Sequence, residues 1–151
     1  MSTAAVELAA ALARHFEGLY LSPYLCPAGV ATIGYGATYY EDGTHVTLHD
    51  ASITKDRAES LLLWMLRTKY LPSVMQLCPN VDEPERLAAL IDFAFNLGAG
   101  NLRVSTLRKC VNAGEWVLVP TELRKWSKAG GRVLKGLAAR REAEIACARL
   151  Q

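Results

Sequence analysis

One short segment of this chain differs in character from the sequence on either side of it. Between residues 30 and 48, β-forming residues alternate with glycines, and Glu41-Asp42-Gly43 supplies a turn between Tyr39-Tyr40 and Thr44-His45-Val46. That pattern is typical of a hairpin region, here of about three short strands. The flanking sequence shows helical periodicity instead. We therefore predict an α+β fold, in which a small β-hairpin lobe is inserted early into a larger helical body.

The helices nearest the hairpin region can be outlined from periodicity and end signals. Apolar residues at helical spacing predict a first helix over residues 3–16, followed by a loop around Pro23. Thr54 is a good N-cap for a second helix that runs to about Tyr70, because a threonine hydroxyl can accept a hydrogen bond from a free backbone N–H. Pro72 lies beyond the expected end of that helix.

The remaining sequence predicts further helices of moderate length. They cover residues from Pro84 to about Leu97, from Ser105, from about Glu115 to Lys128, and from about Leu137 to the end. A chain of 151 residues fits one domain, so residues 1–151 are expected to form a single unit. Its hairpin region would be residues 30–48 and its helical body residues 54–151. Two lobes that share a long helix would leave a cleft between them.

Charge is distributed unevenly along the chain. Residues 1–102 hold 6 basic and 11 acidic residues, whereas residues 103–151 hold 11 basic and 4 acidic ones. A basic third of this kind can face a polyanion such as nucleic acid, an acidic membrane or an acidic wall polymer. The simpler explanation on charge alone is a solvated helix surface.

The cysteines and the N-terminal sequence bear on where the chain works. Cys26, Cys78, Cys110 and Cys147 show no metal-binding spacing, so we expect reduced thiols of a chain that folds in the cytosol, and no zinc site. The N-terminus lacks the pattern of an ordinary signal peptide. The longest uncharged stretch, residues 18–40, is too rich in Gly, Pro, Ser and Thr for a membrane helix.

Three polar side chains stand where helix, loop and strand are expected to converge. Glu17 ends the first helix, Cys26 lies on the following loop, and Thr32 lies on the first expected strand. Glycoside hydrolysis needs an acid that protonates the leaving oxygen and a second group that guides water or stabilises the charged sugar. A carboxyl group half-buried at an element boundary can hold its proton for this purpose. Taken alone, Glu17 is more simply a surface carboxylate.

The spacing of these residues carries a resemblance. Glu, eight residues, Cys or Asp, five residues, Thr is the signature of the phage T4-type lysozymes, glycoside hydrolase family 24, and Glu17, Cys26 and Thr32 meet it without a gap. Further similar stretches follow in order along nearly the whole chain. They are T-I-G-Y-G from residue 32, I-T-K-D-R-A-E at 53–59, A-L-I-D-F-A-F-N-L-G-A-G-N-L at 89–102, S-T-L-R-K at 105–109 and W-S-K-A-G-G-R-V-L-K-G-L-A-A-R-R-E-A-E at 126–144.

The resemblance implies a two-lobed lysozyme fold and an endolysin that cleaves the β-1,4 bond between N-acetylmuramic acid and N-acetylglucosamine in bacterial peptidoglycan. Glu17 would be the general acid, with Cys26 and Thr32 positioning the attacking water. Three residues would line the saccharide cleft, although each has a structural explanation too: Phe95, Ser105 and Thr38. Phe95 fits an apolar core, and Ser105 fits an N-cap.

The resemblance also implies how such a protein reaches its substrate. It would act as a monomer without metal or organic cofactor, and without binding nucleic acid. It would wait in the host cytoplasm until a holin-type membrane protein lets it reach the wall in the periplasm, where it lyses the cell. The basic C-terminal third would then be attracted to an anionic, carboxylate-bearing glycan.

Several alternatives stay open at this stage. A lytic transglycosylase would use Glu17 alone, and a wall-binding protein would use the same scaffold without catalysis. A thiol amidase would use Cys26 as nucleophile and one of three histidines, His15, His45 or His49, as base. A thiol with an ordinary pKa of about 8.5 is mostly uncharged near neutral pH, which makes Cys26 a poor base. The sequence does not decide whether Arg140 or Arg141 pairs with Glu17.

Overall fold

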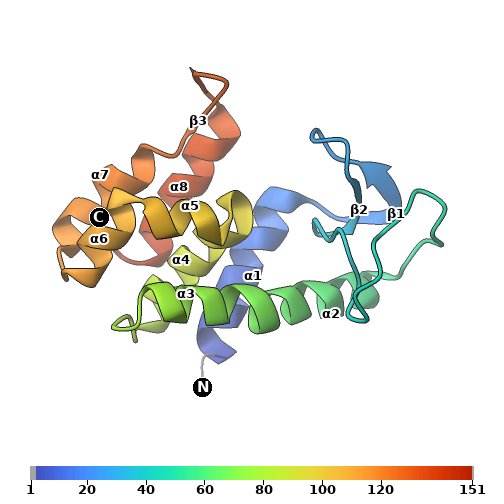
Figure 1. Cartoon of the computed structure of the whole chain (residues 1–151), viewed down its shortest axis with the longest axis horizontal. Helices are drawn as coiled ribbons and strands as arrows, with labels where there is room; N and C mark the ends of the chain where they lie inside the picture. The colour runs from blue at the N-terminus through green and yellow to red at the C-terminus, as the bar shows by residue number, and fades with distance from the viewer. Residues whose placement is uncertain (1–2, 151) are drawn as a thin grey trace.

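The computed structural model describes residues 3–150, and its elements form the predicted two lobes (Figure 1). A small β lobe with strands β1 and β2 lies at one side, helices α4 to α8 form the larger lobe, and a long helical segment runs along the base between them. In chain order the first elements are α1 (Thr3–Glu17), β1 (Tyr20–Leu25), β2 (Ala31–Gly34), α2 (Lys55–Met65), η1 (Leu66–Tyr70) and α3 (Leu71–Leu77). They are followed by α4 (Pro84–Leu97), α5 (Ala99–Val104), α6 (Thr106–Asn112), η2 (Trp116–Leu118), α7 (Val119–Arg124), β3 (Lys128–Ala129), β4 (Arg132–Val133) and α8 (Lys135–Cys147).

The β lobe begins earlier than residue 30, so the prediction of a loop around Pro23 was wrong. Strand β1 contains Pro23 and pairs antiparallel with β2, and the pairing is irregular between Tyr20 and Tyr24. Proline has no N–H to donate, but in a two-stranded sheet every strand has a free edge where that donor is not needed. The predicted turn at residues 41–43 is present and brings Tyr39 opposite His45 as an isolated bridge.

The segment that joins the lobes is longer than predicted. Thr54 caps α2 by accepting a hydrogen bond from the backbone N–H of Arg57 at 3.0 Å, as expected. Pro72 does not end the segment, however, because η1 is a π-helical turn whose wider hydrogen bonding lets α3 begin at Leu71 with proline in its first turn. The helical path therefore continues through Tyr70 to Leu77.

Helix α4 is the centre of the larger lobe and packs against α1 and α8. Its apolar face is almost fully buried, in agreement with the predicted periodicity, and it ends at Gly98 as expected. The helix expected over 115–128 is wrong in extent: it consists of η2 and α7 and ends at Arg124. The short hairpin of β3 and β4 then follows, because Gly130 and Gly131 both have positive φ and allow the tight turn. No helix within residues 3–150 is both long and apolar enough to cross a membrane.

Candidate active site

Glu17 is the last residue of α1, at the junction of the two lobes. Gly18 follows with φ +75°, a backbone conformation that ends helices and that glycine adopts without strain. The Glu17 side chain is 24% exposed, so it reaches both the interior and solvent. A pocket of about 360 Å³ opens beside it. The pocket is lined by Phe16, Glu17, Asn96, Leu134, Gly136, Leu137 and Arg140.

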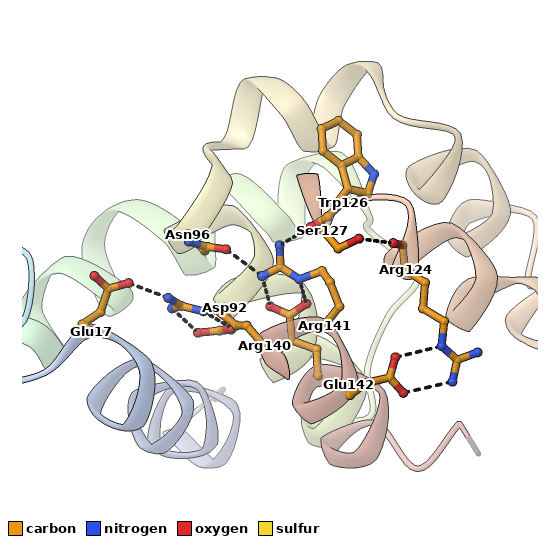
Figure 2. A network of polar contacts seen from close by, with 10 residues as sticks. Glu17, Asp92, Asn96, Arg124, Trp126, Ser127, Arg140, Arg141 and Glu142 are labelled. Carbon is orange, nitrogen blue, oxygen red and sulfur yellow. Dashed lines mark hydrogen bonds and ion pairs between the residues drawn. The ribbon is translucent and has the colours of Figure 1, made fainter. Parts of the chain in front are cut away.

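Arg140, and not Arg141, pairs with Glu17 (Figure 2). Its Nη1 donates to Oε2 of Glu17 at 2.6 Å, while Nε and Nη2 donate to the two carboxylate oxygens of Asp92 at 2.9 and 2.7 Å. Arg140 is 4% exposed and Asp92 is fully buried. Burial opposes the guanidinium charge, but the two carboxylates outweigh it and raise the pKa of Arg140.

The second oxygen of Glu17 faces the backbone of the β lobe. A Cβ atom on Gly36 would lie 3.1 Å from Oε1 of Glu17, so a glycine at this position keeps that oxygen unobstructed. Within residues 3–150, the only hydrogen bond to the Glu17 carboxylate comes from Arg140 to the other oxygen. The two oxygens are therefore inequivalent: one is held by a cation and the other is available for a proton.

Arg141 points into the larger lobe and binds different partners. Its Nη2 donates to Oδ1 of Asn96 and to Oε2 of Glu144, both at 2.8 Å, and Nη1 donates to the carbonyl oxygen of Trp126 at 3.3 Å (Figure 2). Arg141 and Glu144 are both fully buried. Burial is the main reason that the pKa of Glu144 is raised well above its ordinary value; the neighbouring Asp92 carboxylate adds to the rise, and Arg141 opposes it.

Cys26 and Thr32 lie close together in the β lobe. Thr32 is buried and its hydroxyl donates to the carbonyl oxygen of Val30 at 2.9 Å. Hydrogen bonding from the backbone of Val30 lowers the pKa of the Cys26 thiol, and the backbone of Ala28 and the Thr32 hydroxyl lower it further, although partial burial opposes them. The thiol thus ionises more readily than its ordinary value indicates, and no histidine is among the groups that act on it.

Tyr24 links this pair to the acid. It lies opposite Thr32 in the sheet, and burial, Tyr20, Glu17 and Cys26 together raise the pKa of its hydroxyl. Glu17 and Cys26 therefore both influence the pKa of the Tyr24 hydroxyl. Tyr24 itself packs on Tyr20, with ring centroids 4.1 Å apart.

The three residues expected in the saccharide cleft belong to three different segments of the fold. Phe95 is half-buried in α4 and packs edge-on against Tyr70, with ring centroids 5.1 Å apart. Ser105 is buried and caps α6, accepting from the N–H of Arg108 at 3.0 Å and donating to the carbonyl oxygen of Leu102 at 2.7 Å. Thr38 is half-buried in the β lobe. None of the three is among the residues that line the pocket beside Glu17, and their role in binding stays a prediction.

Three residues of the site were missed from sequence. Asp92 carried a usable signal, because an acid on the apolar face of a helix needs a buried partner. Gly36 carried a weaker one, since a glycine in a strand-like segment often marks a close approach of another group. Nothing in the sequence marked Tyr24. Within residues 3–150, no group of three or more His, Cys, Asp or Glu side chains is arranged to hold a metal ion.

Comparison with known proteins gives consistent likenesses. The sequence model of the family described as Phage lysozyme matches residues 14–144. A SAR-endolysin of Bacteriophage PS119 is 36% identical over 131 residues, which are 85% of this chain and 73% of that protein. The matched region includes Glu17, Cys26, Thr32 and Arg140.

Solved structures resemble the whole fold. An endolysin from Escherichia coli O157:H7 phage FAHEc1 superposes with a TM-score of 0.82 at 28% identity, covering 93% of this chain and 89% of that one. The muramidase domain of SpmX from Asticaccaulis excentricus superposes with a TM-score of 0.74 at 28% identity, covering 92% of each chain. Both likenesses extend over the two lobes and the helical segment between them.

Proposed function

This chain belongs to the phage lysozyme family, and we propose that it cleaves the β-1,4 bond between N-acetylmuramic acid and N-acetylglucosamine of peptidoglycan with Glu17 as the general acid. Its relatives are endolysins, and the proteins that share its fold include endolysins and a muramidase, so the chain is a glycoside hydrolase of the lysozyme type. Bacterial peptidoglycan is the substrate that this family implies.

The asymmetric environment of Glu17 is the observation that carries the proposal. Arg140 holds Oε2 at 2.6 Å, and Gly36 leaves Oε1 unobstructed. A general acid must present one oxygen in a fixed direction with its proton directed toward the leaving group. We infer that Glu17 acts in this way beside the pocket of about 360 Å³, where a proton on Oε1 would pass to the glycosidic oxygen of a bound sugar.

Cys26 and Thr32 would act on the water. Both residues come from the β lobe, whereas Glu17 is the last residue of α1, so the water-holding groups and the acid lie on different parts of the fold. Thr32 already donates to Val30, which leaves its oxygen free to accept a hydrogen bond from water. The Cys26 thiol, with its lowered pKa, would accept a second one. A water oriented in this way can attack the sugar carbon once the leaving oxygen is protonated.

The basic C-terminal region gives a reason for the wall as partner. Lys128, Arg132 and Lys135 are exposed on or beside the hairpin of β3 and β4, and Leu134 and Gly136 next to them line the pocket. Peptidoglycan carries carboxylates on its lactyl groups and stem peptides, which these cations would attract. By resemblance Phe95, Ser105 and Thr38 would contact the saccharide, and a holin-type membrane protein would release a monomeric enzyme from the host cytoplasm.

The activity test uses Gram-negative cells whose outer membrane has been permeabilised. We expect the native protein to lower their turbidity and Glu17→Gln to lose most of this activity, by about 10²–10⁴-fold, because an amide cannot donate the proton. Glu7→Gln is the matched control, since Glu7 is exposed on the same helix. Retention of more than a tenth of native activity by Glu17→Gln, with an unchanged melting temperature, would contradict the acid role.

Analysis of the products separates the alternatives. Reducing muramic acid ends are expected from a hydrolase. Anhydro-muramic ends would identify a lytic transglycosylase, and new amino groups on stem peptides with intact glycan would identify an amidase. Binding without any of these products would identify a non-catalytic wall-binding protein.

A further inference from the structure

Asp92 is a buried acid on the largely apolar face of α4. It lies on α4 between Ile91 and Phe93, and all three side chains are fully buried. A buried carboxylate is costly unless a cation and hydrogen bonds compensate it. An apolar residue here would leave the buried cation that pairs with Asp92 uncompensated, so the use of the charge is to be sought in that partner.

That partner is Arg140, whose three donor nitrogens bind two different carboxylates. Nε and Nη2 bind the two oxygens of Asp92, which fixes the plane of the guanidinium in the interior (Figure 2). Nη1 is then directed toward Glu17, and among residues 3–150 its hydrogen-bond partner is Oε2 of Glu17. Without Asp92, the guanidinium would be free to turn and to bind both oxygens of Glu17, as arginine commonly does with a single carboxylate.

The titratable and charged groups around Glu17 come from three packed elements. Helix α8 contributes Arg140, with Arg141 and Glu144 deeper inside; α4 contributes Asp92; and β1 contributes the Tyr24 phenol. Besides Glu17 itself, Asp92 directly contacts the cation of Arg140, at 2.7 Å. It therefore offsets part of the positive charge that Glu17 experiences from Arg140.

We propose that Asp92 is a positioning residue for the acid: it fixes the direction of Arg140 and moderates its charge, so that Glu17 keeps one oxygen for a proton. The inference rests on the proposed function of Glu17. A merely structural Asp92 would contribute to folding but would not change the pH at which the enzyme loses its acid. The pH profile of activity therefore distinguishes the two roles.

The main test is Asp92→Asn, an isosteric change that removes the charge. The uncompensated guanidinium should favour ionised Glu17, so the alkaline limb of the kcat profile should move down by about 1 pH unit. At pH 7, kcat should fall about five- to tenfold or more while KM changes less, because the loss lies in the chemical step. The control is Glu142→Gln, on α8 like Arg140, which breaks an exposed pair with Arg124 of α7 and should leave the alkaline limb in place. A folded Asp92→Asn with an unmoved limb would overturn the proposal.

A second comparison applies even if Asp92→Asn fails to fold. Arg140→Gln is compared with the double variant Asp92→Asn/Arg140→Gln, in which the buried pair is replaced by two neutral amides. If Asp92 acts through Arg140, the additional change should leave kcat within about twofold, and it should raise the melting temperature by removing an unpaired buried carboxylate. A further tenfold loss of kcat would show that Asp92 acts by another route, and would overturn the proposal.

Glu17→Gln, assayed beside these variants, separates the inference from its premise. If Glu17→Gln stays active, the proposed acid is wrong, and Asp92 has no acid to position. If Glu17→Gln is inactive while the limb of Asp92→Asn is unmoved, the proposed function stands and only the role of Asp92 fails.

Discussion

The Oε1 atom of Glu17 lies 3.1 Å from the point that a Cβ atom on Gly36 would occupy. That separation is shorter than an ordinary van der Waals contact, so any other residue at this position would displace either the carboxylate or the turn of the β lobe. Gly36 also has φ +94°, a conformation that disfavours side chains in its own right. The acid and the turn therefore constrain each other.

Gly36→Ala should consequently lower the activity of the enzyme more than its stability. We expect about a 10–100-fold loss of kcat, because small displacements of a reacting group have effects of that order. The matched control is Gly43→Ala: Gly43 has φ +88° and no atom within 4 Å of its virtual Cβ. Both variants should lose about 1–2 kcal/mol of stability from the positive φ, measured by thermal unfolding. Equal loss of activity in both would show that contact with Glu17 is not the cause.

Ser105→Ala tests whether Ser105 caps a helix, binds saccharide or does both. The hydroxyl is buried and already accepts from Arg108 and donates to Leu102. We therefore expect the free energy of unfolding to fall by about 1 kcal/mol, as for other lost N-caps, with KM for peptidoglycan unchanged. Ser105→Thr keeps the hydroxyl and should lose less stability. A several-fold rise in KM for Ser105→Ala alone would instead support the saccharide contact that the family resemblance implies.

Helices with strong periodicity and clear end signals were the predictable part of the fold. The N-caps at Thr54 and Ser105 and the end of α4 at Gly98 agree with the sequence, because each depends on local chemistry. Strand β1 was missed because Pro23 indicates a loop unless it is known that the strand lies at a sheet edge, which is a tertiary fact. The π-helical turn before Pro72 has no reliable sequence signature.

The candidate site, like the fold, was only partly predictable from the sequence. The spacing of Glu17, Cys26 and Thr32 was available from the sequence, and the structure brings Cys26 and Thr32 together. The choice between Arg140 and Arg141 was not available, because both are buried and adjacent on one helix. Only the packing of α8 against α1 and α4 directs one to Glu17 and the other to Glu144.

Glu144→Gln should change how stability depends on pH. The pKa of Glu144 is raised mainly by burial, so the folded protein keeps a proton that the unfolded chain loses above about pH 4.3. Its contribution to stability is full below that pH and is lost as the pH rises through the raised pKa. The melting temperature of Glu144→Gln relative to the native protein should therefore increase with pH. A difference that stays constant from pH 4 to 8 would contradict this.

Glu142→Gln is the control with the opposite sign. Hydrogen bonding to Arg124 lowers the pKa of Glu142, so its contribution is present above about pH 4.3 and is lost as the pH falls through the lowered value. Its melting temperature relative to the native protein should increase toward acid pH. The effect should be small because both side chains are about half exposed.

Cys26→Asp decides between a water-holding and a covalent role for the thiol. Backbone hydrogen bonding at Val30 and Ala28, with the Thr32 hydroxyl, already favours a negative charge at this position. A carboxylate should therefore be accepted there, and it can hold water as well as the thiol does. We expect lytic activity within about tenfold of the native enzyme.

The added charge also favours protonated Glu17, so the alkaline limb of the activity profile should extend to higher pH. Cys26→Asn, of equal size but uncharged, should leave the limb in place. If Cys26 were instead a covalent nucleophile, neither variant could form the thioester, and a folded but inactive Cys26→Asp would assign the thiol a chemical role.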